Sequence, residues 1–264
     1  MKKSLLYILA VLVGSLLFGA CDKHDSASDP APDSYSEFFI NPPSFNTPSG
    51  SKVYWDDDGL WWSPKDDLVL INGNLYKITK GTDPNTGATQ WKTVGGLQTF
   101  KVDDNFYCCY IGQSTQSPEW DEGNKIYHNV NLENIVPLVG ESRDNLMTLK
   151  PCCAVLKIIN LDRQIVITFP PTVKFYYNGD LNVTQALLQN PSDDGKNQFR
   201  VRPDNNTAYV ILPMTSDLLA VGGQITIAYK DDDRQTQTRT TRESGVSINK
   251  GYVYVIDFAQ LQGN

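Results

Sequence analysis

Short apolar runs dominate the chain from Glu37 onward. In these runs β-branched and aromatic residues alternate with polar ones, and glycine, proline, asparagine or aspartate separates each run from the next. A period of two is typical of β-strands, whereas an amphipathic helix repeats its apolar positions every three to four residues. The pattern predicts a first strand within 35–51 and further strands over 68–71, 75–79, 98–102, 106–111, 126–132, 154–160, 165–169, 173–177, 199–202, 208–212, 224–230, 235–241 and 252–258.

Two of the separating segments predict β-hairpins. Asn72-Gly73 lies between two apolar runs, and this dipeptide tolerates the positive φ angles that a two-residue hairpin turn requires. The acidic residues 231–233 join two alternating runs in the same way. Only residues 184–189 have the composition of a short helix, which Pro191 would end.

Many short strands at this spacing are typical of β-sandwiches. Residues 143–148 are polar, and a new apolar strand begins directly after Pro151. We therefore expect an all-β protein with two sandwich domains in tandem, over residues 37–150 and 151–264.

The amino terminus has the pattern of a secretory signal. Lys2 and Lys3 precede an apolar run over residues 5–18, which is too short and too close to the start for a membrane span. Residues 17–21, Leu-Phe-Gly-Ala-Cys, resemble a bacterial lipobox. The resemblance implies a signal peptide over 1–20, cleavage before Cys21 and lipidation of Cys21; the alternative is an ordinary signal peptide that happens to end near a cysteine. Residues 21–36, poor in large apolar side chains, would then form a flexible tether.

Charge and histidine content argue against two classes of function, nucleic-acid binding and catalysis. The chain has 23 Lys and Arg against 30 Asp and Glu, a formal charge of −7, which argues against non-specific binding to nucleic acid. It has only two histidines, and none of the common nucleophile, zinc-protease or phosphate-loop motifs occurs. Composition therefore disfavours an enzyme, and no cofactor is expected.

Four stretches, taken in order, resemble the fimbrillin-like lipoproteins of Bacteroidales-type bacteria: the tryptophan–acidic–strand–glycine–tyrosine segment 62–76, the strand 149–158, the strand 208–213 that ends in proline, and the glycine–tyrosine strand 249–256. The resemblance covers roughly residues 37–258. It implies two transthyretin-like β-sandwich domains and a role as stalk, anchor or tip subunit of a fimbrium on the outer membrane. In that family a protease removes an amino-terminal strand after an arginine, and a strand from another subunit fills the groove, which is a case of strand addition.

The chain departs from a stalk subunit of that family in two ways. It has no arginine before Arg143, so Lys52 is the basic residue left as a candidate processing position. The sequence also stops at Asn264, soon after the last expected strand, without a donor segment. These departures favour a lipid-anchored or accessory subunit, whose expected partners are other fimbrial subunits, the outer membrane through Cys21, and a host or glycan ligand.

The four remaining cysteines form two adjacent pairs, Cys108-Cys109 and Cys152-Cys153, each on an expected strand. Neighbouring strand residues point to opposite faces, so one sulfur of each pair should point inward and one outward. Buried free thiols are the favoured interpretation, and a disulfide between the pairs is the alternative. Zinc is disfavoured because adjacent strand residues cannot both face one ion, so no metal site is expected.

All five tryptophans precede residue 121. Trp55, Trp61 and Trp62 adjoin the acidic residues 56–58, and exposed rings beside carboxylates could stack on sugars. Core packing is the commoner role of tryptophan in a sandwich and is preferred here. The acidic clusters are interpreted as solvated turns rather than calcium sites. A glycan-binding surface lipoprotein is thus the alternative function, and exposure of these three rings would distinguish it.

Overall fold

The structure is a computed structural model, which describes residues 34–35, 37–41, 43–50, 52–54, 67–82, 86–87, 89–94, 100–101, 104–112, 116–133, 135–240 and 245–262. Residues 35–264 form one compact unit, to which the following description applies. No helix in the described ranges is long and apolar enough to cross a membrane.

Fourteen short strands are described up to Pro151. They are β1 (Ser34–Tyr35), β2 (Phe39–Asn41), β3 (Ser44–Asn46), β4 (Lys52–Tyr54), β5 (Leu68–Ile71), β6 (Asn74–Thr82), β7 (Thr89–Val94), β8 (Phe100–Lys101), β9 (Phe106–Gly112), β10 (Glu119–Asp121), β11 (Ile126–Asn131), β12 (Leu138–Ser142), β13 (Leu146–Thr148) and β14 (Lys150–Pro151).

Eleven further strands and one short helix are described from Cys153 onward. They are β15 (Cys153–Ile159), β16 (Ile165–Thr168), β17 (Asn178–Asn182), β18 (Leu187–Gln189), β19 (Gln198–Val201), β20 (Ala208–Pro213), β21 (Leu218–Val221), β22 (Thr226–Lys230), β23 (Thr236–Thr240), β24 (Val246–Asn249), β25 (Val253–Asp257) and α2 (Phe258–Gln262).

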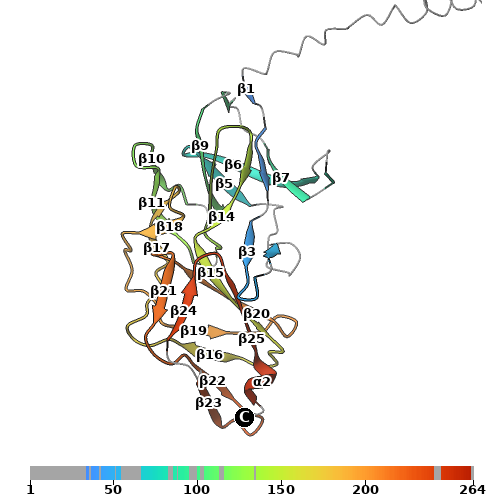
Figure 1. The fold of residues 1–264 in the computed structure, drawn as a ribbon, viewed down its shortest axis with the longest axis vertical. Coiled ribbons are helices and arrows are strands. Elements are labelled where there is room, and N and C mark those ends of the chain that lie inside the picture. Colours follow the sequence, from blue (N-terminus) through green and yellow to red (C-terminus); the bar gives the residue numbers. More distant parts are fainter. Residues whose placement is uncertain are drawn as a thin grey trace, which may run out of the picture. The chain divides into compact units, whose positions relative to one another are not determined.

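An eight-stranded sheet has the order β13-β2-β7-β6-β5-β9-β12-β14 (Figure 1). Its strands come from residues 39–151. Most pairs are antiparallel, but β2 runs parallel to β13 and antiparallel to β7. Strand β2 therefore lies inside the sheet, with a neighbour on each side.

The remaining residues build smaller sheets. Strands β20-β15-β25 form one sheet and β19-β16-β22-β23 form another, which lies near α2 and away from β5, β6 and β7 (Figure 1). A third sheet, β10-β11-β17-β18, joins strands from both halves of the sequence. The eight-stranded sheet ends at Pro151 and the next sheet begins at Cys153, so the expected boundary at 150/151 coincides with a change of sheet.

Two buried clusters lie on the two faces of the central strands. On β9, Cys108 and Tyr110 belong to one cluster, while Cys109 and Ile111 belong to the other. The second cluster continues into the carboxy-terminal half, where it includes Ile165 and many other side chains. A strand covered on both faces is apolar at consecutive positions, which explains the unbroken run over residues 106–112.

The all-β class and the packing of sheets as sandwiches are confirmed. Both expected hairpins are present, at β5–β6 and at β22–β23. In the first, Asn72 and Gly73 have φ angles of 46° and 79°, as the turn residues of such a hairpin require. The division into two domains stays a prediction.

Two local expectations were wrong. Residues 184–189 do not form a helix: Asn182 accepts hydrogen bonds from the Thr184 hydroxyl and the Gln185 amide, and Ala186 has a φ of 52°, so the chain turns back into β18. Residues 173–177 do not form a strand either. The Asp193 carboxylate accepts the amide hydrogen of Tyr177, a group that a neighbouring strand would otherwise bind.

Candidate functional site

Strand β2 is the element that the expected strand exchange would act on. The single expected strand within 35–51 is divided into β2 and β3, and Phe38, Ile40 and Phe45 along it are fully buried. Ile40 opposes Met147 of β13 on one side and Trp91 of β7 on the other. The segment thus fills a slot in the eight-stranded sheet with apolar side chains.

Backbone hydrogen bonds hold this segment on both sides. The Phe39 amide donates to the carbonyl of Asn145, at 2.7 Å, next to β13. On the side of β7, the Thr93 amide donates to the Phe38 carbonyl at 2.9 Å, and the Phe38 amide donates to the Thr93 hydroxyl at 2.9 Å. Removal of the segment would expose both flanking strands as unpaired edges.

Side-chain contacts also hold the segment around β2 in the eight-stranded sheet. The rings of Phe38 and Phe106 meet edge to face, with centroids 5.2 Å apart. Glu37 and Lys92 form an ion pair of 3.0 Å at the surface, which contributes little to stability in such an exposed position. The contacts that hold the strand are therefore mainly apolar packing and backbone pairing.

The chain beyond β2 reaches the carboxy-terminal half. The Asn46 amide donates a 2.7 Å hydrogen bond to the carbonyl of Gly251, two residues before β25. Lys52, the candidate processing residue, begins β4 and lies opposite Asn46 in the β3–β4 pair. Of Lys52 the structure describes the backbone only.

Several residues singled out in the sequence lie outside the described residues. These are Cys21 and the three tryptophans Trp55, Trp61 and Trp62, so lipidation and the sugar platform stay predictions. Both described tryptophans pack against the core. Trp91 is 1 % exposed, and Trp120 is partly buried, with its ring centroid 4.5 Å from that of Tyr127.

The two cysteine pairs are buried and carry free thiols. The expectation that one sulfur of each pair points outward was wrong, because the strands that carry them are covered on both faces. Cys108 and Cys153 lie in one cluster, and Cys109 and Cys152 lie in the other. Burial raises the pKa of Cys109 to about 12 and raises that of Cys153 as well.

Most acidic groups in the described ranges serve as turn caps or ion-pair partners. Asp231 accepts the amide hydrogen of Gln235 at 2.7 Å in the β22–β23 turn. Asp193 accepts the amide hydrogens of Tyr177 and Gly195. No group of three or more His, Cys, Asp or Glu side chains that could hold a metal ion occurs in the part that the structure describes.

His128 is placed between two carboxylates on the sheet that joins the two halves. Its Nδ1 lies 3.1 Å from Asp180 of β17, and its Nε2 lies 3.7 Å from Asp121 of β10. The hydrogen bond to Asp180 raises the pKa of His128 above its ordinary value. One imidazole between two carboxylates is therefore an ion-pair arrangement.

Sequence reasoning missed the partner of the buried segment. Residues 143–148 are polar enough to suggest a linker, yet β13 lies within them and Met147 is 1 % exposed. A single buried side chain in a strand of three residues leaves almost no periodic signal. The parallel pairing of β13 with β2 can therefore be found only in three dimensions.

Comparison with known proteins gives a structural match without a sequence match. No protein-family model matches the chain, and no curated protein matches it. The fold resembles that of a candidate cell-adhesion protein from Bacteroides uniformis, with a TM-score of 0.50 and 11 % identity over 85 % of this chain and 93 % of that one.

Two further solved structures align less well. A candidate cell-adhesion protein from Bacteroides fragilis gives a TM-score of 0.38 at 9 % identity, over 84 % of this chain and 92 % of the other. The tip fimbrial protein Mfa3 from Porphyromonas gingivalis, truncated at its carboxy terminus, gives 0.32 at 9 % identity, over 84 % and 94 %. The first comparison is the one that supports a shared fold, and at 11 % identity it supports the fold alone.

Proposed function

We propose that this protein is a non-catalytic, lipid-anchored cell-surface subunit of a bacterial fimbrium, of the anchor or accessory type, which joins its partners by strand addition. The observation that carries the proposal is the amino-terminal segment around β2, which is buried, apolar and paired on both sides within a sheet. The shared fold with a candidate adhesion protein from Bacteroides uniformis supports the same class.

The mechanism of strand addition follows from the position that residues 35–51 occupy in the eight-stranded sheet. If residues 35–51 leave the sheet, Phe38, Ile40 and Phe45 leave an apolar slot, and β7 and β13 are left with unpaired amide and carbonyl groups. A strand from another subunit would satisfy both, with backbone hydrogen bonds and with alternate side chains in the slot. This chain would be the acceptor, while lipid on Cys21 would hold it at the outer membrane.

Lipid anchoring at Cys21 is tested on protein extracted from the bacterial membrane. Mass spectrometry of membrane-extracted protein should find a lipid-modified terminus at Cys21, and Cys21→Ala should release the protein from the membrane. A terminus at Val53 would instead indicate processing after Lys52 and a polymerising subunit. Lys52→Ala is the matched control, since it blocks such processing without changing the lipidation site.

Strand exchange is tested with the chain from Asp22 carrying a specific protease site between β3 and β4. Cleavage and mild denaturation should release the segment, lower the melting temperature and allow a synthetic peptide of residues 35–51 to restore it. The same peptide with Ile40→Asp should fail, because it brings a charge into the buried slot. Equal rescue by both peptides, or no change on release, would contradict an acceptor role for this sheet.

A further inference from the structure

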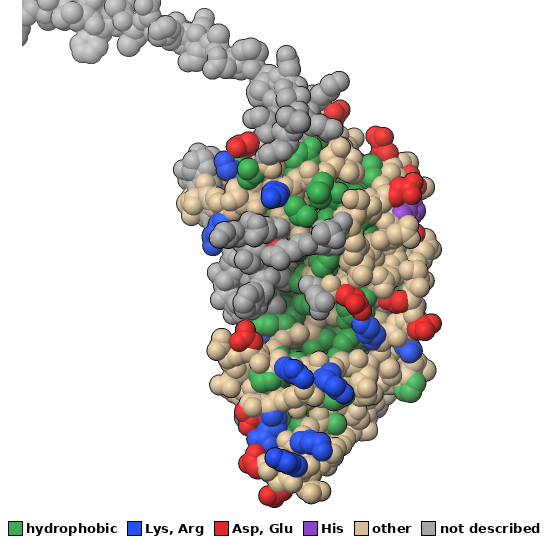
Figure 2. Space-filling view, turned by 180° about the vertical axis from the view of Figure 1, so that it is seen from behind, with side chains coloured by type: hydrophobic (Ala, Val, Ile, Leu, Met, Phe, Trp, Pro, Cys, Tyr) green, Lys and Arg blue, Asp and Glu red, His purple; other side chains and the backbone are tan. Residues whose placement is uncertain are grey.

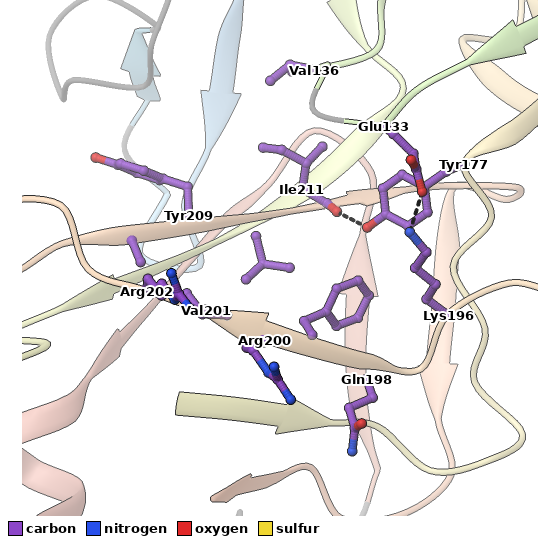
Figure 3. Close-up of a pocket in the computed structure, with 13 residues that line it drawn as sticks. Glu133, Val136, Tyr177, Lys196, Gln198, Arg200, Val201, Arg202, Tyr209 and Ile211 are labelled. Atoms are coloured by element: carbon purple, nitrogen blue, oxygen red, sulfur yellow. Dashed lines mark hydrogen bonds and ion pairs between the residues drawn. The ribbon is translucent and has the colours of Figure 1, made fainter. Parts of the chain in front are cut away.

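A second place where a strand could be added lies in the carboxy-terminal half, between β19 and β20. The two strands follow each other in sequence and diverge from a short turn closed by the Asp204–Thr207 bridge. Each enters a different sheet: among the described strands β19 pairs with β16 only, and β20 with β15 only. Between the two edges lies a hollow of about 650 Å³ (Figure 3).

Part of the wall of this hollow is apolar. It is lined by Val136, Phe199, Val201, Val210 and Ile211, among others. Figure 3 shows Ile211 and Val136 on the side of the hollow opposite β19. Apolar side chains from two sheets thus line one opening, where an apolar ligand side chain would be removed from water.

One end of the hollow is closed by a packed group of side chains. The Tyr177 hydroxyl donates a 2.6 Å hydrogen bond to the Ile211 carbonyl on β20 (Figure 3). The Lys196 ammonium lies 5.0 Å from the centre of the Tyr177 ring and forms an ion pair with Glu133. A ligand would therefore lie along β19, starting from this end.

The register of β19 shows which of its backbone groups are available. The Phe169 amide donates to the Asn197 carbonyl, and Phe199 and Val201 follow at alternate positions opposite Ile167 and Ile165. In an antiparallel pair, alternate residues direct their amide and carbonyl groups toward the partner strand. The backbone groups of Gln198 and Arg200 consequently point away from β16, toward the free edge.

Charge is distributed unevenly around the opening. Gln198, Arg200 and Arg202 are exposed and alternate with the more buried Phe199 and Val201. Glu133 is the single acid among the residues that line the hollow, and Lys196 already pairs with it. Figure 2 shows lysine and arginine side chains gathered beside an apolar hollow on this face.

We propose that β19 and this hollow bind an extended segment of a partner protein in which apolar residues alternate with carboxylates. Paired with β19, such a segment would direct its apolar side chains between the sheets. The alternate side chains would lie beside Arg200 and Arg202, since successive strand residues face opposite sides. Both the shape of the hollow and the charge at its rim therefore specify the same periodic sequence.

The inference concerns a site separate from β2 and can be tested with that strand in place. The probe is a blocked eight-residue peptide in which valine alternates with aspartate, and the comparison peptide has lysine in place of aspartate. With the chain from Asp22, we expect saturable binding of the aspartate peptide at least about tenfold tighter than that of the lysine peptide.

The double variant Arg200→Glu/Arg202→Glu should reverse that preference, because it reverses the charge at the rim. Arg143→Glu changes the same kind of charge in the exposed turn between β12 and β13 and should leave the preference unchanged. Both variants alter exposed side chains, and an unchanged melting temperature verifies that they are folded. A peptide with methylated backbone amides should lose binding, since it cannot pair as a strand.

Three results would overturn the proposal. These are the absence of saturable binding by the aspartate peptide, an unchanged preference in the double variant, and equal binding of the methylated peptide. Each of them leaves the outcome at β2 unaffected, because release of residues 35–51 is measured separately. Failure of strand exchange at β2, in turn, leaves the peptide titration valid.

Discussion

The Tyr110 hydroxyl donates a 2.6 Å hydrogen bond to Oδ2 of Asp67 inside the protein, where Asp67 is only 4 % exposed. Asp67 directly precedes β5, and Tyr110 lies on β9, opposite Val69. Burial and the adjacent carboxylate raise the pKa of Tyr110 far above its ordinary value, so the phenol stays a hydrogen-bond donor at any physiological pH. This hydrogen bond therefore holds the residue directly before β5 against the neighbouring strand β9.

Tyr110→Phe should therefore lower the free energy of unfolding by about 1.5–3 kcal/mol, because it removes a hydrogen bond to a buried charged group. The measurement is urea unfolding at pH 7. Tyr107→Phe on the same strand is the control, since no hydrogen bond of the Tyr107 hydroxyl is among the described contacts, and it should cost less. Equal costs for the two variants would show that the Asp67 contact contributes nothing specific.

The hairpin turn at Gly73 gives a second prediction. Gly73 has a φ of +79°, and a Cβ added there would lie 2.9 Å from the Cβ of Trp120. Gly73→Ala should cost about 1–3 kcal/mol through backbone strain and this contact. Thermal unfolding measures the change.

Gly50→Ala is the matched control for that variant. Gly50 has a φ of +86°, yet an added Cβ would meet nothing within 4 Å. Gly50→Ala should show the cost of the positive φ angle alone, and its loss of stability should be smaller than that of Gly73→Ala. If Gly50→Ala costs as much, the contact with Trp120 is not the reason for glycine at position 73.

The local parts of the fold could be predicted from the sequence because their causes are local. The β5–β6 hairpin depends on Asn72 and Gly73, which supply the turn conformation themselves. Strand β16 is recognisable because buried Ile165 and Ile167 alternate with more exposed neighbours. In both cases the residues that determine the structure are adjacent in the chain.

The two candidate strand sites depend on contacts that the pattern does not contain. Strands β2 and β13 have three residues each and pair over about a hundred intervening residues. The hollow beside β19 exists because β19 and β20, although consecutive, enter different sheets. Alternation indicates that residues 198–201 form a strand, but not which of its edges is covered.

The buried thiols give a third prediction. Burial raises the pKa of Cys109 to about 12 and that of Cys108 and Cys152 well above the ordinary value. Since the thiolate is the reactive form, Cys108, Cys109, Cys152 and Cys153 should all resist iodoacetamide in the native protein at pH 8. All four should react after unfolding in guanidinium chloride. Rapid labelling of the native protein at any of them would contradict their burial.

The last prediction concerns pH and His128, which faces Asp180 of β17 and Asp121 of β10 and lies opposite Glu119 in the β10–β11 register. The hydrogen bond to Asp180 raises the pKa of His128. At Asp180 itself, burial would raise the pKa, but hydrogen bonds from Asn190 and His128 outweigh it and lower the value. Hydrogen bonds from Asn124 lower the pKa of Asp121 as well. Both partners therefore remain ionised when His128 becomes protonated.

The sign of the effect follows from the raised pKa. A histidine whose pKa is higher in the folded than in the unfolded state stabilises the fold fully below its unfolded pKa, near 6.5. That contribution is lost as the pH rises through the folded pKa. His128→Gln should thus destabilise the protein more at pH 5.5 than at pH 8.5, by about 0.5 kcal/mol for so exposed a pair.

Urea unfolding at the two pH values measures this difference, and NMR titration of the histidine ring protons measures the pKa directly. The chain has two histidines, so the signal that disappears in His128→Gln is assigned without ambiguity, and that of His24 serves as the reference. A His128 pKa at or below that of His24, or equal destabilisation at both pH values, would show that Asp121 and Asp180 do not stabilise its charged form. The ion pair would then contribute nothing to the stability of the sheet β10-β11-β17-β18.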